Sequence, residues 1–176
     1  FGEQHLVPPC HSVGKWKCKL KMENAKPLKR HPSLQPLSRD HHHGLLLCWK
    51  IRTGLSKGAA PERVKAYADW FFAEHLLPHF ELEERHIFPL LGDKEHPMVK
   101  RALREHRRLR RLFTANNDLA KNLNLIEKEL TAHIRYEERV LFTELQSVAT
   151  PEQLSEIERL HHGLPFVEEW EDRFWE

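Results

Sequence analysis

The sequence predicts an all-α protein, arranged as an up-down four-helix bundle with a short additional helix after it. Apolar residues recur at helical spacing through most of residues 37–160, and no stretch alternates as a half-buried strand does. Glycine is scarce, with 7 residues in a chain of 176. Turn signals at 58–61, 92–93 and 116–118 divide the periodic region into four segments.

The ends of the first two helices follow from their flanking residues. Ser38 is a favourable N-cap for the first helix, and Gly58 ends it. The second helix is expected over 61–91 and starts with proline at its first position. Pro78 lies inside this pattern, so we expect a kink directly before His79.

The remaining helices are predicted in the same way. The third starts near Pro97, and the fourth runs over 118–148. Thr-Pro-Glu-Gln at 150–153 indicates a capping box that opens a short fifth helix. We therefore expect residues 149–176 to form a C-terminal helical extension. Its apolar stripe, spaced i, i+4, i+8, should pack on the bundle or on a partner and consists of Phe166, Trp170 and Phe174.

Residues 1–36 differ from the rest, because they are rich in proline and lysine and show no clean periodicity. We interpret them as a loosely ordered leader before a bundle over 37–148. Residue 1 is not Met and Met22 offers a coding start, which leaves open whether residues 1–21 are native coding sequence. Cys10, His11 and Cys18 lack the spacing of a zinc knuckle, so a disordered stretch is favoured over a metal site there.

Composition excludes several classes of function. The formal net charge of +2 gives no general reason to expect nucleic acid as a partner. Arginines crowd the third helix, but no aromatic residues alternate with them, so a solvated face is favoured. No run of 18 apolar residues exists, hence no membrane span is expected, and no secretory signal opens the chain. Three cysteines fit reduced thiols, which favours a cytoplasmic location.

Histidine is the outlier in composition, with 14 residues. Four of them lie at mirror-image distances from the three predicted turns: His42, His79, His106 and His133. If antiparallel helices join at those turns, the four imidazoles return to the same height, because an error of two residues moves a side chain by only ~3 Å. The sequence therefore predicts a metal site in the core of the bundle.

Two of these histidines are followed four residues later by glutamate, at Glu83 and Glu137. That spacing places both side chains on one helix face. One such pair alone is usually a solvated surface contact, but here two pairs combine with two further histidines and apolar neighbours. Two converging carboxylates need a positive partner, which two cations would supply. Mixed nitrogen and oxygen ligands suit iron or manganese, and zinc is an alternative.

A ferritin-like di-iron site is the competing pattern. It needs Glu-x-x-His on two helices and a single glutamate on each of two others. Glu83 with His86, and Glu158 with His161, match the spacing. The count fails, because the fourth helix has no such pair and the first has no glutamate. We keep His86 as a spare ligand or a group that holds one.

Four segments together resemble the hemerythrin-like, or HHE cation-binding, domains over roughly residues 37–148. They are SRDHHH at 38–43, HFELEERHIFPL at 79–90, EHRRL at 105–109 and HIRYEERVLF at 133–142. The resemblance implies an up-down four-helix bundle that holds a non-heme di-iron centre. It also implies that the bridging carboxylates are Glu83 and Glu137. The terminal ligands that it implies are His42, His79, His106 and His133.

Two positions depart from a simple transfer of this pattern. On the first helix the choice lies between His41 and His42, and His42 is favoured because Leu45, Leu46 and Trp49 share its face. Oxygen carriers of the family bring another histidine four residues after the ligand of the third helix, where this chain has Arg110. The site is therefore one ligand short of a reversible oxygen carrier. The spacing of four residues between His133 and Glu137, where the carriers have five, also resembles the bacterial and sensor-like members more than the carriers.

The resulting hypothesis is a protein that binds iron and, through it, dioxygen, nitric oxide or peroxide, for sensing, storage or protection. A di-iron enzyme, an oxidase or an iron-nitrosyl or iron–sulfur repair protein, is the second reading. The third is a partner-binding module with a structural metal, in which the C-terminal extension forms the interface with another protein or with a second copy.

Overall fold

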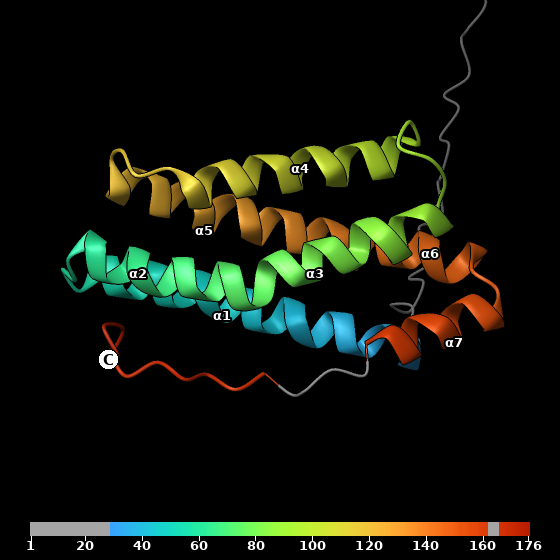
Figure 1. The fold of residues 1–176 in the computed structure, drawn as a ribbon, viewed down its shortest axis with the longest axis horizontal. Coiled ribbons are helices and arrows are strands. Elements are labelled where there is room, and N and C mark those ends of the chain that lie inside the picture. The colour runs from blue at the N-terminus through green and yellow to red at the C-terminus, as the bar shows by residue number, and fades with distance from the viewer. Residues whose placement is uncertain (1–28, 162–165) are drawn as a thin grey trace, which may run out of the picture.

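The computed structural model describes residues 29–161 and 166–176, and all regular structure in this part of the chain is helical (Figure 1). Four long helical arms follow one another. Arm 1 is α1 (Gln35–Ser56), and arm 3 is α4 (Pro97–Thr114). Arm 2 joins α2 (Pro61–Phe71), the π turn η2 (Phe72–Leu76), α3 (Leu77–Leu82), the π turn η3 (Glu83–Ile87) and η4 (Phe88–Leu90). Arm 4 joins α5 (Leu119–Tyr136), the π turn η5 (Glu137–Leu141) and α6 (Phe142–Val148). The turn η1 (Pro32–Leu34) precedes arm 1, and α7 (Pro151–Leu160) follows arm 4.

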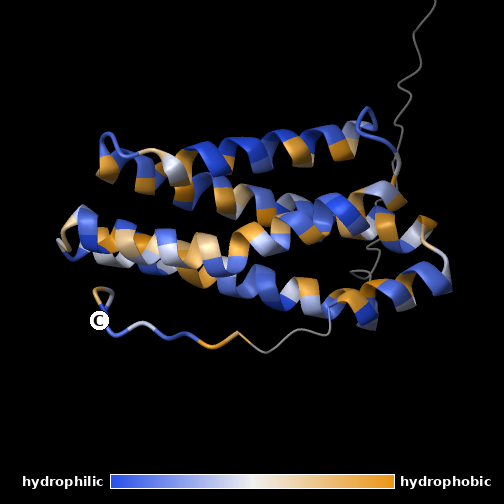
Figure 2. Ribbon diagram, viewed as in Figure 1, coloured by the Kyte–Doolittle hydropathy of each residue, from blue (hydrophilic) through white to orange (hydrophobic). Residues whose placement is uncertain are grey.

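Successive arms run in opposite directions along the long axis of the molecule (Figure 1). The most extensive packing between arms joins α1 to α5 and α4 to α5. Apolar residues face the interior, and the outer side of α4 is strongly hydrophilic (Figure 2). The prediction of an all-α protein is confirmed for the described residues. None of the helices described is both long and apolar enough to cross a bilayer.

The apolar core is divided into two clusters, one toward each end of the arms. The first includes Leu47, Phe71 and Phe113, and the second includes Leu34, Phe88 and Phe142. On every arm, the histidines and glutamates predicted to bind metal lie between residues of the first cluster and residues of the second. The polar centre is therefore enclosed by apolar packing along the axis of the arms.

Arm 1 begins earlier than the sequence predicted. The helix starts at Gln35, and Pro36 is tolerated because it lies in the first turn. Ser38 is not the N-cap; its hydroxyl donates a hydrogen bond of 2.8 Å to Glu138 on arm 4. The helix instead extends from a buried anchor, Leu34, which is 0% exposed.

The expectation of a loosely ordered leader is wrong for residues 29–36. Arg30 forms an ion pair of 2.8 Å with Glu138, and the backbone N–H of His31 donates to Gln146 at 3.1 Å. These contacts join the segment to arm 4, more than one hundred residues later in the chain. Residues 1–28, with the proposed coding start and the cysteine–histidine group, lie outside the described residues.

Pro78 does not end arm 2. Proline lacks an N–H and clashes with the carbonyl one turn earlier, so an ordinary helix is disturbed there. Here the π turn η2 (Phe72–Leu76) comes directly before, and its wider spacing of hydrogen bonds accommodates the proline while the arm continues to Leu90. The disturbance expected before His79 therefore takes the form of a π turn.

The predicted capping box is confirmed: Thr150 and Gln153 exchange side-chain and backbone hydrogen bonds at the start of α7. The prediction of a helical extension to residue 176 is wrong, because α7 ends at Leu160 and residues 166–176 are not helical. In this tail the three aromatic residues nevertheless pack on the bundle core, as expected. A spacing of four places side chains on one side of an extended chain as well as of a helix.

The tail should contribute measurably to stability. Phe174 is 5% exposed and its ring lies so close to Gly54 that a Cβ there would collide with it. Phe174→Ala should lower the free energy of unfolding by about 3 kcal/mol through lost burial and a residual cavity. Urea denaturation measures this change, with the exposed Glu171→Ala as control. Equal midpoints for the two variants would mean that the tail does not pack on the bundle in solution.

Candidate metal centre

Six buried polar side chains from all four arms meet between the two apolar clusters. Each is at most 6% exposed, and both glutamates are 0% exposed. We refer to these six as the histidine–glutamate cluster: His41, His79, Glu83, His106, His133 and Glu137. Side chains of this kind are rarely buried unless they are paired, hydrogen-bonded or bound to a metal.

On arm 1 the structure places His41 in the cluster, and not His42. His41 Nε2 lies 3.1 Å from Glu137, whereas His42 is exposed. The choice of His42 is thus corrected. It depended on apolar neighbours that are in fact 37–44% exposed: Leu45, Leu46 and Trp49. The signal for the inner face was Gly44, where a Cβ would lie 2.9 Å from Ile134, so the two helices approach closely on that side.

Glu83 contacts imidazoles from three arms. Its Oε1 lies 3.3 Å from His79 Nε2 and 3.7 Å from His41 Nε2. Its Oε2 lies 3.4 Å from His106 Nε2. The carboxylate therefore reaches between histidines that stand on different sides of the cluster.

Glu137 is placed in the same way from arm 4. Its Oε2 lies 3.1 Å from His41 Nε2 and 3.2 Å from His133 Nε2, and its Oε1 lies 3.8 Å from His106 Nε2. Two sets of four potential ligand atoms result, each within 4.8 Å of one another. One set contains His41 and His79, the other His106 and His133, and both contain the two glutamates. This is the arrangement that two cations with shared carboxylates require.

A π turn begins at each of the two buried glutamates, η3 at Glu83 and η5 at Glu137. Such turns are rare and occur often at functional sites, because they change the direction of a few side chains inside a helix. Each glutamate is followed by a second one that contacts a histidine of another arm: Glu84 contacts His106, and Glu138 contacts His41.

The outer nitrogen of every histidine in the cluster contacts a carboxylate. The Nδ1–oxygen distances are 2.7 Å for His41 with Glu138, 3.1 Å for His79 with Asp40, 2.8 Å for His106 with Glu84 and 2.9 Å for His133 with Glu105. A carboxylate at Nδ1 holds the proton there and leaves the lone pair on Nε2, directed into the cluster. Metal-binding histidines are commonly oriented in this way.

Sequence reasoning missed these four outer carboxylates, although a signal was present. Asp40 and Glu105 directly precede cluster histidines, and Glu84 and Glu138 directly follow cluster glutamates. The acidic residues of arms 1 and 3 orient the histidines of arms 2 and 4. The acidic residues of arms 2 and 4 in turn orient the histidines of arms 3 and 1. The centre therefore has an approximate internal twofold pattern.

Most inward atoms of the cluster lack hydrogen bonds among the described residues. They include Nε2 of His41 and of His79, and both carboxylate oxygens of Glu83 and of Glu137. Buried polar groups without partners destabilise a core by several kcal/mol in total, at about 1–3 kcal/mol each. The ion-pair distances around these atoms are short, but none of these contacts is a hydrogen bond.

On the other side of the cluster, Nε2 of His106 and Nε2 of His133 lie 3.0 Å apart. With both Nδ1 atoms holding protons for carboxylates, the two lone pairs repel unless a cation or a proton lies between them. Two nitrogens bound at right angles to one cation, about 2.1 Å from it, are about 3.0 Å apart. The residues present therefore fit a bound metal.

In the metal-free cluster the histidines carry raised pKa values. Burial lowers the pKa of His79 and of His133, but the charge of the neighbouring glutamate in each case outweighs burial and raises it to about 9. Burial likewise opposes protonation of His41, and the neighbouring carboxylates of Glu137 and Glu138 raise its pKa well above the usual range. At neutral pH these imidazoles are protonated when no metal is bound.

Other residues singled out from the sequence lie elsewhere. His86 is exposed and outside the cluster, so it is not a spare ligand in this structure. Arg110 does not reach Glu83 or Glu137; its Nη1 lies 2.8 Å from Glu84.

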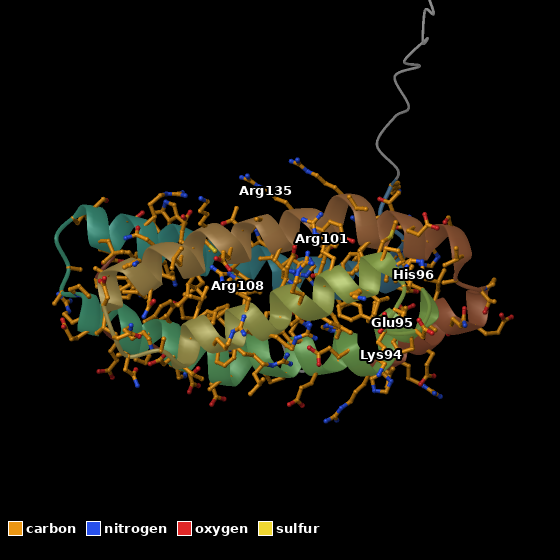
Figure 3. The ribbon with its side chains drawn as sticks, turned by 90° about the horizontal axis from the view of Figure 1, so that it is seen from above. Lys94, Glu95, His96, Arg101, Arg108 and Arg135 are labelled. Atoms are coloured by element: carbon orange, nitrogen blue, oxygen red, sulfur yellow. The ribbon has the colours of Figure 1, made fainter. Side chains whose placement is uncertain are left out.

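The arginines of arm 3 fit the interpretation of a solvated face. Arg101, Arg108 and Arg135 extend along the side formed by α4 and α5 (Figure 3). Arg101 and Arg108 form ion pairs with Glu105 and Glu129 respectively. The charges of these two arginines are thus paired with carboxylates of the same molecule.

The corrected position on arm 1 gives a direct test by adjacent substitutions. His41→Ala should lower the amount of metal retained after anaerobic loading with Fe²⁺ by at least half, because it removes an inward ligand. His42→Ala should leave it unchanged, because that side chain is exposed. Metal is counted by mass spectrometry after desalting. If His42→Ala lost the metal and His41→Ala retained it, His42 would be the inward residue.

Metal binding should release protons at neutral pH. The Nε2 atoms of His79 and His133 must lose their protons before they bind a cation, and their pKa values of about 9 keep them protonated at pH 7. Titration calorimetry of metal-free protein with Zn²⁺, in buffers of different ionisation enthalpy, should show two or more protons released per chain at pH 7. Release should fall as the pH rises through 9. A value near zero at pH 7 would contradict protonated histidines.

One family model matches part of the chain. The model of the hemerythrin HHE cation-binding domain matches residues 34–115, which span arms 1 to 3 with His41, His79, Glu83 and His106. Arm 4 lies beyond the match but supplies the remaining two cluster residues. Neither the curated proteins nor the solved structures include a match to the chain. The resemblance seen in the sequence is therefore confirmed: residues 34–115 match the hemerythrin HHE cation-binding domain family.

Proposed function

We propose that this protein binds two iron ions in the histidine–glutamate cluster, within an up-down four-helix bundle of the hemerythrin type. His41 and His79 would hold one ion, and His106 and His133 the other, with Glu83 and Glu137 between them. One observation carries the proposal: two sets of four ligand atoms share both glutamates, and the oxygens of these glutamates, like Nε2 of His41 and of His79, make no hydrogen bond among the described residues. His41 takes the place first assigned to His42.

The ligand chemistry supports iron. Four imidazoles and two carboxylates form a mixed nitrogen and oxygen set, and the buried thiol of Cys48 is not part of it. Thiolate-rich sites favour zinc and iron–sulfur clusters, whereas this set suits iron or manganese. The six side chains offer at most eight ligand atoms, and two octahedral ions need about twelve. Room therefore remains for solvent or a small ligand.

The surroundings of the cluster favour chemistry with small molecules. Phe80 stacks on His106 with ring centroids 3.9 Å apart, and Phe142 stacks on His41 at 5.3 Å. These rings exclude bulk water and strengthen electrostatic interactions inside the cluster. A dinuclear iron centre, when bound, supplies a redox-active site for dioxygen, nitric oxide or peroxide. We therefore propose sensing, protection or iron storage, with a cytoplasmic location that stays a prediction.

The other two readings have less support. In the described part of the tail, Phe166 and Trp170 pack on the bundle and Phe174 is buried, so the proposed partner interface is already covered by the chain itself. Within the part of the chain that the structure describes, no specific contact distinguishes a di-iron enzyme from a binding protein. Turnover of ferrous iron or peroxide remains the experiment that would favour the enzyme.

Metal content and the shared glutamates are tested together. Protein produced with ample iron should carry about two iron atoms per chain. Glu83→Ala and Glu137→Ala should each lose most of it, because each carboxylate serves both ions. Glu81→Ala, an exposed change on the same arm, is the matched control. Purified protein with a single ion per chain, or with zinc alone, would contradict the proposal.

Arg110 leads to a prediction about oxygen. Arginine cannot bind a cation, and here it pairs with Glu84, so it contributes no ligand. We expect the reduced, iron-loaded protein to be oxidised by air and not to return to the ferrous state when oxygen is purged. Stopped-flow absorbance follows the reaction, with zinc-loaded protein as the unreactive control. Full recovery of ferrous protein through several cycles would show reversible carriage instead.

A further inference from the structure

The four outer carboxylates differ in their second partner. Three of them pair with arginine at 2.8 Å: Glu84 with Arg110, Glu105 with Arg101 and Glu138 with Arg30. The fourth, Asp40, pairs with a histidine: Nε2 of His161, at the end of α7, lies 2.9 Å from its Oδ2. Among the described residues no arginine or lysine forms an ion pair with Asp40.

This difference changes what the Asp40 corner can bind. Guanidinium stays protonated and offers no lone pair, whereas imidazole binds metals readily. Asp40, His79 and His161 place one potential ligand atom each within 4.8 Å of one another. The inward nitrogen of His79 faces the cluster, so this group is separated from the cluster by one imidazole ring.

A cavity of about 350 Å³ opens at the same corner. It lies between arm 1, arm 2 and the end of α7, and Asp40, His79 and His161 are part of its wall. Further potential ligands line it: His43, Glu74 and His75. Asp40 is 37% exposed, and Glu74 is also exposed, so solutes can reach their carboxylates.

Two imidazoles of this wall lack partners. Nδ1 of His43 and Nε2 of His75 are buried and make no hydrogen bond within the described residues. Both rings pack on Phe166 of the tail, with centroid distances of 4.3 Å and 4.2 Å. The cavity thus gathers carboxylates and unpaired imidazoles without a guanidinium among them.

We propose that Asp40 and His161 bind a divalent transition-metal ion in this cavity, as an accessory site outside the dinuclear cluster. Nitrogen and oxygen ligands of this kind suit Zn²⁺, Fe²⁺ or Mn²⁺. The site goes beyond the proposed function and does not depend on it, because neither Asp40 nor His161 belongs to the cluster.

The alternative is a simple ion pair between His161 and Asp40 that holds the end of α7 in place. His161→Arg separates the two cases. An arginine keeps a positive partner for Asp40, as at the other three corners, but it cannot bind a cation. His42→Ala, which removes an exposed histidine from the same helix as Asp40, controls for loose binding at the surface.

The measurement is equilibrium dialysis of metal-stripped full-length chains against Zn²⁺, with zinc counted by mass spectrometry. We expect wild type and His42→Ala to bind one Zn²⁺ per chain more than His161→Arg. Equal zinc content in wild type and His161→Arg would overturn the accessory site. The zinc that His161→Arg still binds reports on the histidine–glutamate cluster alone. If the proposed function fails, that amount falls, whereas the difference in zinc between wild type and His161→Arg reports only on the accessory site.

A second measurement covers the case in which His161→Arg does not fold. An anomalous difference map at the zinc edge, from crystals of the wild-type protein grown with Zn²⁺, should show a peak within bonding distance of Asp40 and His161. A map with peaks in the cluster and none at this corner would overturn the proposal.

Discussion

The structure depends on two carboxylates, Glu83 and Glu137, that are fully buried among four imidazoles and make no hydrogen bond among the described residues. Two like charges at this depth are unfavourable unless positive charge lies between or beside them. Protonated histidines supply it in the metal-free cluster, where attraction to His133 outweighs burial and the repulsion of Glu83 and holds the pKa of Glu137 at about 2. Bound cations would supply it better, because they also occupy the unpaired atoms. The two π turns that begin at these glutamates are the local distortion that places them.

Around this centre, charge alternates outward in layers. Inner carboxylates meet imidazoles, imidazoles donate to outer carboxylates, and three of the outer carboxylates meet arginines. Each layer neutralises the one inside it. The outer pairs are partly exposed to solvent, and exposed ion pairs contribute little to stability by themselves. Their effect is orientation: they fix which ring nitrogen of each histidine faces inward. The exception at Asp40, where histidine and a cavity replace arginine, makes one corner of an otherwise symmetric centre chemically different.

Much of this arrangement could be predicted from spacing alone. His79, Glu83, His106, His133 and Glu137 meet because helical register and turn positions determine height and face. The choice between His41 and His42 on arm 1 could not be made from spacing. Neighbouring residues of a helix point about 100° apart, and the exposed leucines and tryptophan beside His42 have the apolar character expected of a core face. The fold of the tail was ambiguous because a spacing of four suits both helix and extended chain. The role of His161 depends on a contact between α7 and arm 1, about 120 residues apart, which no local pattern encodes.

The central claim is that one cluster holds two metal ions through shared glutamates. X-ray absorption spectroscopy of the iron-loaded protein at the iron edge tests it most directly, because scattering from a second iron is distinct from scattering by light ligand atoms. The account predicts a mixed nitrogen and oxygen shell and an iron–iron vector of no more than about 4 Å. A spectrum with the light-atom shell alone, from protein that carries its full complement of iron, would show isolated ions and contradict the account.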